Sequence, residues 1–174
     1  MISAPGKICV AGEWAVLEKG NPIIVAAVDQ RIFVDFKKSP DEFIHISLND
    51  FGIENLKCKF HKGEIKFCRK LKTKEKKHLP FIKSALESVL RYTDFQFPFW
   101  VEARVGNKPS QIIREGPKDK KMFGFGASAA SVVAVVAGLL KMHGENIKEN
   151  QGREKIYKLS AIAHYLAQEK VGSG

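Results

Sequence analysis

Residues 124–130 read Gly124-Phe125-Gly126-Ala127-Ser128-Ala129-Ala130, and this stretch joins a glycine-containing loop to a helix of small residues. Glycine lets the backbone adopt a positive φ and approach a ligand closely. The start of a helix presents unpaired N–H groups and the positive end of the helix dipole. Together these features predict a phosphate-binding site at the beginning of a helix that we expect over residues 128–142.

Two other phosphate-binding loops do not fit the sequence. A Walker A loop requires the pattern GxxxxGK[ST], and the chain contains no such run. The dinucleotide fingerprint GxGxxG/A is matched by Gly124, Gly126 and Ala129, but the preceding residues 116–121 are Gly-Pro-Lys-Asp-Lys-Lys, which is not a buried strand. Taken alone, the motif leaves open the alternative that the glycines only form a turn before a core helix.

The length and hydrophobic content of the chain favour a single soluble domain, and its positive charge favours anionic binding partners. The chain has 174 residues, of which 44% are hydrophobic, and a net charge of +10. The charge does not choose between nucleic acid, an anionic membrane and small anionic substrates. Three cysteines without metal-binding spacing are typical of a reducing cytosol. No secretory signal is visible, and the longest apolar stretch, 132–140, is far shorter than the roughly 18 residues of a membrane span. We therefore expect a cytoplasmic protein.

Hydrophobic periodicity predicts strands followed by helices, which favours an α+β layer architecture. Strands are expected over residues 7–11, 23–36, 44–48 and 97–105, and helices over 79–92, 128–142 and 153–170. Pro5-Gly6 is expected to form a turn, and 49–66 to be irregular with weak strand signals. The basic stretch 69–78 lacks interleaved aromatic residues, so we expect a solvated connection rather than a nucleic-acid patch.

Three segments resemble the GHMP kinases, the superfamily of galactokinase, homoserine kinase, mevalonate kinase and phosphomevalonate kinase. Residues 3–17, SAPGKICVAGEWAVL, resemble its N-terminus, and Ala26-Val28-Asp29-Arg31 fits its second strand. Residues 124–130 are similar to its glycine loop, whose usual form is Gly-Leu-Gly-Ser-Ser-Ala-Ala. Residues 164–174, HYLAQEKVGSG, look like the phosphomevalonate kinases in particular. The resemblance implies that residues 1–174 form an ATP-binding N-terminal domain similar to domain 2 of ribosomal protein S5.

The resemblance also implies an activity, cofactors and a set of site residues. It implies Mg²⁺-dependent transfer of a phosphoryl group from ATP to 5-phosphomevalonate, giving 5-diphosphomevalonate in the mevalonate route to isoprenoids. Lys7 would lie near the substrate and the transferring phosphoryl group, where a cation offsets developing charge. Ser128 would lie near Mg²⁺ and phosphate, although a helix N-cap is an alternative role for this serine. The residues expected around the ATP phosphates are Gly124, Phe125, Gly126, Ala127, Ser128 and Ala129, and those near the substrate are Lys7, Glu13 and Ser173.

The sequence departs from the family pattern at several positions. Ala127 stands where serine is usual, Met122 where phosphomevalonate kinases often have lysine, and Glu169 where glycine is usual. Gly-Ser-Gly in the family leads to an aromatic residue and an aspartate, the candidate catalytic base, whereas this chain stops at Gly174. We therefore expect the C-terminal domain to be absent, and the isolated chain to bind nucleotide but to be a poor catalyst.

Two other functions stay open from the sequence. A mevalonate kinase or another member acting on a hydroxyl substrate shares the first two motifs. A non-catalytic module of the same fold that binds RNA or a protein partner fits the positive charge. Two expectations concern residues outside these motifs: an internal ion pair between Asp29 and Arg31 on one strand face, and a core role for His164, with its ring nitrogens satisfied.

Overall fold

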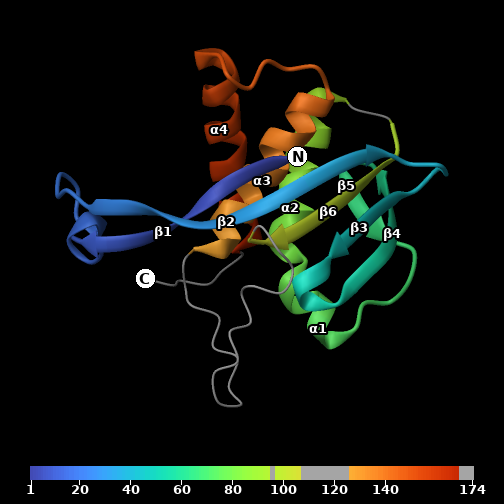
Figure 1. The fold of residues 1–174 in the computed structure, drawn as a ribbon, viewed down its shortest axis with the longest axis horizontal. Helices are drawn as coiled ribbons and strands as arrows, with labels where there is room; N and C mark the ends of the chain where they lie inside the picture. The colour runs from blue at the N-terminus through green and yellow to red at the C-terminus, as the bar shows by residue number, and fades with distance from the viewer. Residues whose placement is uncertain (95–96, 107–125, 169–174) are drawn as a thin grey trace.

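The structure, a computed structural model, describes residues 1–94, 97–106 and 126–168. Its elements follow one another along the chain as Figure 1 shows. In chain order they are β1 (Ile2–Ala11), η1 (Ala15–Leu17), β2 (Ile24–Lys38), β3 (Ile44–Leu48), η2 (Asn49–Phe51), β4 (Ile53–His61), β5 (Glu64–Phe67), α1 (Thr73–His78), α2 (Pro80–Thr93), β6 (Phe99–Val105), α3 (Ala127–Met142) and α4 (Asn150–Ala167). None of the helices in these ranges combines the length and the apolar character that a bilayer crossing requires.

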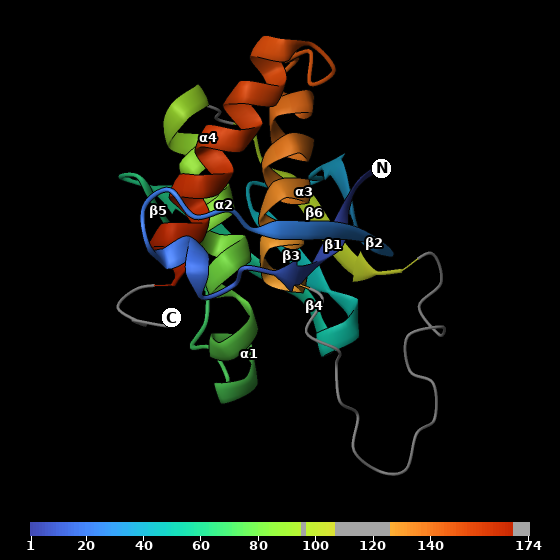
Figure 2. The ribbon, with the colours of Figure 1, turned by 90° about the vertical axis from the view of Figure 1, so that its left-hand side faces the viewer.

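The strands that the structure describes form one mixed sheet with α2, α3 and α4 on one face (Figures 1 and 2). The strand order is β1-β2-β6-β3-β4-β5, in which β3 and β6 are parallel and the other neighbours are antiparallel. Helix α3 packs against β1 and β2, and it also contacts α2 and α4. This arrangement confirms the predicted α+β layer architecture.

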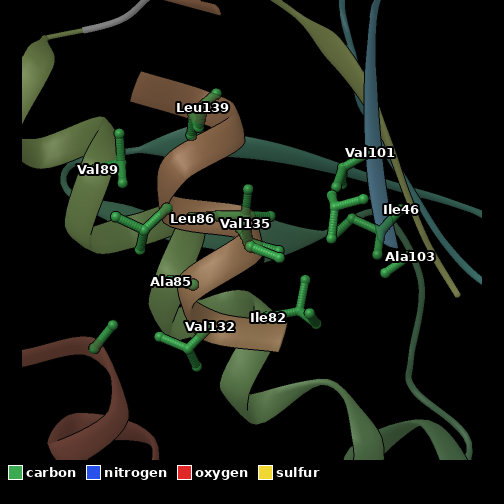
Figure 3. Packing of buried hydrophobic residues seen from close by; sticks show 14 of the residues in the cluster. Ile46, Ile82, Ala85, Leu86, Val89, Val101, Ala103, Val132, Val135 and Leu139 are labelled. Carbon is green, nitrogen blue, oxygen red and sulfur yellow. The ribbon is translucent and has the colours of Figure 1, made fainter. Parts of the chain in front are cut away.

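The core lies between the sheet and helices α2 and α3, as Figure 3 shows. Helix α2 presents apolar residues at the spacing i, i+3, i+4 and i+7, which places them on one helix face. This face meets α3, and inward-facing residues of β3 and β6 close the layer. The buried side chains labelled in Figure 3 are Ile46, Ile82, Ala85, Leu86, Val89, Val101, Ala103, Val132, Val135 and Leu139.

Helix α3 is buried along most of its length, because its sequence offers almost no polar side chain after Ser131. Its close packing is most evident at Gly138. A Cβ atom on Gly138 would lie 2.4 Å from Cε2 and 2.7 Å from Cδ2 of Phe36 on β2. The glycine therefore lets the Phe36 ring lie directly on the helix backbone.

We predict that Gly138→Ala destabilises the protein, although alanine is normally the better residue in a helix interior by roughly 0.5–1 kcal/mol. The new methyl group would overlap the Phe36 ring, and overpacking of this kind costs about 1–3 kcal/mol. Urea unfolding measures the change. The double variant Gly138→Ala/Phe36→Leu should recover part of the loss, and a single variant more stable than the parent would contradict the packing described.

Two segments differ from the expectation drawn from the sequence. Pro5 and Gly6 do not form a turn but lie inside β1, where the register with β2 shifts between them. Proline is tolerated there because β1 is an edge strand of the described sheet. Residues 49–66, expected to be irregular, contain η2, β4 and most of β5. In β4 the buried residues Leu56 and Cys58 alternate with Lys57 and Lys59, as expected of a strand with one buried face. The lysines made this period-two pattern hard to recognise in the sequence.

The basic stretch 69–78 is also more ordered than predicted, because Glu75 organises α1. The Glu75 carboxylate accepts hydrogen bonds from Arg69 Nη1 at 2.8 Å and Nη2 at 2.6 Å, and from the Lys72 backbone N–H at 2.8 Å. Only 5% of Glu75 is exposed. The hydrogen bonds from Arg69, with that from Lys72, lower the pKa of Glu75 from 4.5 to about 2. The segment is thus a short helix held by a buried carboxylate, and not simply a solvated connection.

We predict that Glu75 stabilises the fold in a pH-dependent way. Since its pKa is depressed on folding, its contribution is complete above pH 4.5 and is lost as the pH falls toward 2. Glu75→Gln should therefore lower the free energy of unfolding at pH 7 by about 1–3 kcal/mol, because the amide offers the three donors one uncharged acceptor oxygen in place of a carboxylate. The gap to the parent should close between pH 4.5 and 2. Glu54→Gln, on an exposed side chain, is the matched control; a gap independent of pH would argue against this role.

Candidate phosphate-binding site

The first turn of α3 leaves backbone donors open. Gly126 precedes the helix with a φ of 65°, and the Ala130 N–H donates to the Gly126 carbonyl at 3.1 Å. The N–H groups of residues 127–129 therefore have no acceptor within the helix. Among the described residues, no side chain caps this end. The turn combines free donors with the positive end of the helix dipole, which is the arrangement that favours an anion.

Ser128 lies inside this first turn and is not the N-cap residue, since Gly126 holds that position. The alternative role considered for the serine is therefore wrong. Its carbonyl accepts a hydrogen bond from the Ser131 hydroxyl at 2.7 Å. Its own hydroxyl has no hydrogen-bond partner in the part of the chain that the structure describes. The hydroxyl is therefore available to a ligand.

Lys7 on β1 lies across Gly126, although the two residues are far apart in the sequence. A Cβ atom on Gly126 would lie 3.0 Å from Cγ and 3.7 Å from Cε of Lys7. Cε carries the ammonium nitrogen, so the positive charge lies close to the start of α3. Within the described ranges, Lys7 forms no ion pair with a carboxylate. The structure thus brings an uncompensated cation to the open N–H groups.

A pocket of about 210 Å³ adjoins the same turn of α3. Side chains from η2, α1, α2 and β6 form most of its walls, and these walls are largely apolar. The Asp50 carboxylate on one wall accepts a hydrogen bond from the Val105 N–H at 2.7 Å, which joins η2 to β6. The lining residues are Ile32, Leu48, Asp50, Phe51, Lys77, His78, Phe81, Ile82, Ala103, Arg104, Val105, Ala127, Ser128 and Ser131.

An aromatic pair forms one side of this pocket. The rings of Phe51 and His78 stack with centroids 4.0 Å apart and an angle of 17° between their planes. Burial lowers the pKa of His78, and the charges of Lys77 and Lys74 lower it further. The imidazole is therefore neutral at physiological pH, and the pair offers a flat, uncharged surface to a ligand.

The structure brings some of the expected site residues together and not others. Lys7, Gly126, Ala127, Ser128 and Ala129 meet at the start of α3. Glu13 follows the end of β1 on the arm formed by β1 and the first half of β2, which extends beyond the helices in Figure 1. Gly124, Phe125 and Ser173 lie outside the described residues.

The ion pair expected between Asp29 and Arg31 is not formed. Arg31 instead donates from Nε to the Ser3 hydroxyl at 3.0 Å and from Nη2 to the Ser3 carbonyl at 3.3 Å. The guanidinium thereby ties β2 to the start of β1. Side chains on one strand face lie about 7 Å apart, and a partner on the adjacent strand is nearer.

Sequence reasoning missed the pocket walls. Phe51, Lys77 and His78 lie in the two segments that were expected to be irregular or solvated. No local sequence signal pairs Phe51 with His78, because only the fold places η2 beside the end of α1. As for metals, no group of three or more His, Cys, Asp and Glu side chains within the described ranges is arranged to hold an ion.

Comparisons with known proteins agree on one kinase family. No protein-family model matches the chain. It is 30% identical over 166 residues to a mevalonate kinase of Pyrococcus furiosus, an alignment that covers 95% of this chain and 45% of the relative. It is also 30% identical over 153 residues to a phosphomevalonate kinase of Streptomyces sp. strain CL190, covering 85% of this chain and 39% of the relative.

A solved structure shares the fold over nearly the whole chain. Streptococcus pneumoniae phosphomevalonate kinase, in complex with phosphomevalonate and AMPPNP, matches with a TM-score of 0.60 at 19% identity. The match covers 97% of this chain and 47% of that structure. The chain thus spans less than half the length of the curated relatives it matches. By its sequence relatives, the chain is a homologue of the mevalonate and phosphomevalonate kinases of the GHMP kinase family, and its α+β fold resembles their N-terminal domains.

Proposed function

We propose that this chain is the ATP-binding portion of a kinase that transfers a phosphoryl group from ATP to 5-phosphomevalonate, giving ADP and 5-diphosphomevalonate. The observation that carries the proposal is the packing of Lys7 across Gly126 at the open start of α3. Phosphoryl transfer depends mainly on positioning and on stabilising charge on the phosphate oxygens. A helix N-terminus beside an unpaired lysine supplies both kinds of stabilisation.

The proposed nucleotide position follows from the site. The ATP phosphates would lie against the N–H groups of residues 127–129, and Lys7 would offset negative charge on the transferring group. The adjoining pocket of about 210 Å³ is smaller than the roughly 300–1,000 Å³ of sites that enclose a drug-sized ligand. We therefore assign only the adenine base of the nucleotide to this pocket, with its aromatic ring against the Phe51–His78 pair.

Mg²⁺ would supply positive charge between the ATP phosphates and the protein. The described residues offer one of the oxygen ligands that such an ion needs. Mg²⁺ binds oxygen and is commonly held by a few protein groups together with substrate phosphates. The Ser128 hydroxyl is an oxygen donor without a hydrogen-bond partner among the described residues, and it lies in the first turn of α3. Ser128 is therefore the residue of this chain that we assign to the metal.

The acceptor substrate is proposed on two grounds. The last residues, 164–174, resemble phosphomevalonate kinases, and the net charge of +10 suits a substrate that carries both a phosphate and a carboxylate. The similarity to Pyrococcus furiosus mevalonate kinase, which covers 95% of the chain, makes mevalonate the second candidate. Comparing the two acceptors in a complete kinase that contains this chain decides between them.

We predict that the 174-residue chain binds Mg·ATP at one site in isothermal titration calorimetry. Gly126→Val should weaken binding at least tenfold, because its side chain would displace Lys7 from the start of α3. Ser128→Leu should have a similar effect through the loss of the hydroxyl and a blocked pocket. Lys7→Met should weaken binding more than Lys37→Met, which removes the same charge from the exposed side of β2. Unchanged affinity in all site variants, or a preference for RNA that falls steeply with salt, would overturn the proposal.

We also propose that residues 1–174 form the N-terminal domain and that the remaining part of the kinase packs against the β1–β2 arm. Apolar side chains gather on this arm without cover among the described residues, as shown by Trp14 at 73%, Val10 at 60% and Ile24 at 60% exposure. Exposed apolar patches of this kind mark interaction surfaces. The relatives are more than twice as long as their matched segments, so the unmatched part of such a kinase could cover this surface. That part would supply the catalytic aspartate.

We predict that the isolated chain exposes this surface to an apolar probe. The fluorescence of 8-anilinonaphthalene-1-sulfonate should increase on addition of the chain, and the increase should fall in Val10→Glu/Ile24→Glu. The melting temperature should change little, because both side chains are largely exposed. Val133→Glu, on a less exposed apolar side chain of α3, serves as a control for a general charge effect. No fluorescence increase with the parent chain would show that the arm is not an open apolar surface.

A further inference from the structure

A hollow of about 390 Å³ lies along α2, between β5 and the end of α4. It shares no lining residue with the pocket at the start of α3, although both take residues from the junction between α1 and α2. Its volume is within the roughly 300–1,000 Å³ of sites that hold small molecules. The hollow is therefore large enough for a ligand of its own.

One end of this hollow is polar, because β5 and the second half of α2 lie against each other there. The Glu87 carboxylate accepts a hydrogen bond from the Ile65 N–H at 2.7 Å, and Arg91 donates from Nε to the Gly63 carbonyl at 2.5 Å. A ligand group at this end therefore meets charged and hydrogen-bonding side chains. The polar lining residues at this end are Glu64, Glu87, Ser88 and Arg91.

The other end is apolar, because the chain after β5 and the end of α4 meet the start of α2. Ser84 donates to the Ala163 carbonyl at 2.7 Å, and the ring of His164 lies 5.2 Å from that of Phe81, so α4 is held on α2. His164 is itself partly exposed and its ring nitrogens have no hydrogen-bond partner among the described residues, so the satisfied core role expected for it is wrong. The apolar lining residues at this end are Phe67, Leu71, Leu79 and Leu166.

Ser88 brings an unpaired hydroxyl to the polar end. The residue is only 9% exposed, and it lines the hollow. Its hydroxyl has no hydrogen-bond partner in the described part of the chain. The hydroxyl is not fully enclosed either, because Ser160 is the residue that holds an enclosed, unpaired side-chain oxygen within the described ranges. Buried polar groups are normally hydrogen-bonded, so the Ser88 hydroxyl is open to a ligand in the hollow.

Arg91 places unused donors beside this hydroxyl. It follows Ser88 by three residues on α2, a spacing that makes the two side chains neighbours on the helix surface. Its Nε is bound to Gly63, whereas its Nη1 and Nη2 groups have no acceptor among the residues that the structure describes. The guanidinium fork matches the oxygens of a carboxylate or a phosphate. Ser88 and Arg91 therefore form a pair of donors suited to an acidic group.

The other charged groups of the hollow leave this pair available. Glu87 is already engaged, since its carboxylate pairs with Lys83 at 2.7 Å and also accepts the Ile65 N–H. Glu64 forms no ion pair with Arg91 or any other described residue, so it is the carboxylate that opposes an anion here. Lys76 adds a positive charge at the far rim. The lining thus carries three cations and two carboxylates, which leaves a net positive charge.

We propose that this hollow binds a small amphiphilic anion, with its acidic group against Ser88 and Arg91 and its apolar body against the apolar end. A carboxylate and a phosphate present the same kind of acceptor oxygen, so the site is assigned to this shared chemistry. The inference goes beyond the proposed kinase function and does not depend on it, because the two sites have separate linings.

Nuclear magnetic resonance of the amide groups tests the proposal, with hexanoate and hexyl phosphate as probes and 1-hexanol as their uncharged counterpart. We expect saturable shifts of the amides of β5 and of residues 84–91 with one or both anions, and much weaker binding of 1-hexanol. Comparing the two anions identifies the preferred acidic group. Shifts confined to the start of α3, or equal binding of 1-hexanol, would overturn the proposal.

Variants identify the groups that hold the anion. Arg91→Gln should weaken binding of the preferred probe by about tenfold and Ser88→Ala by about threefold, because each removes a hydrogen bond to the acidic group. Glu64→Gln should strengthen binding by about twofold, since it removes the opposing charge. Lys66→Gln is the matched control: it removes an exposed charge next to Phe67 but does not line the hollow, so the affinity should not change.

The melting temperature of each variant separates binding from folding. Arg91 also ties α2 to the β4–β5 turn through Gly63, so Arg91→Gln is expected to melt at a lower temperature. Ser88→Ala and Glu64→Gln remove no hydrogen bond or ion pair within the described residues, and their opposite effects on affinity test the site without a change in stability. Unchanged affinity in both of these variants, or no saturable shift with either anion, would overturn the proposal and leave the nucleotide site unaffected.

Discussion

Burial of α3 is the constraint on which the rest of this structure depends. The helix packs against β1 and β2 on one side and against α2 and α4 on others, and its middle residues are almost completely inaccessible. A side chain with an unpaired polar atom would be costly in such a place, which is consistent with the run of alanine, valine and leucine. Gly138 allows the Phe36 ring to rest on the helix backbone. The apolar area buried around α3 holds the sheet and the helical layer together.

A helix held so firmly also fixes the direction of its first turn. Its N-terminal N–H groups cannot turn away from the site, so they are oriented before any ligand arrives, which is the condition under which fixed dipoles stabilise charge best. Gly126 lets the Lys7 stem cross the start of the helix, with its Cγ 3.0 Å from where a Cβ would lie. Close packing of the core and the electrostatics of the candidate site are therefore consequences of the same placement of α3.

Most regular elements of the fold were predictable, but those in the two lysine-rich segments were not. The helix over residues 79–92 was expected from its apolar spacing, and the structure has it at Pro80–Thr93. Residues 49–66 and 69–78 were expected to be irregular or solvated because lysines dominate them, yet they form β4, most of β5 and α1. Glu75 illustrates the reason. Its stabilising effect comes from Arg69 and the Lys72 N–H converging on one carboxylate, which no periodicity of hydrophobic residues reveals.

The sequence by itself determined the local features, such as the helix after Gly126 and the helix over Pro80–Thr93, because these depend on residues close together in the chain. The resemblance of its motifs also indicated the kinase family that the relatives confirm. Only the tertiary structure decided that Lys7 crosses Gly126, that Phe51 and His78 form a pocket wall, and that His164 contacts Phe81. These contacts join residues far apart in the chain, and they arise from how the sheet and helices bury their apolar faces, which local sequence patterns do not specify.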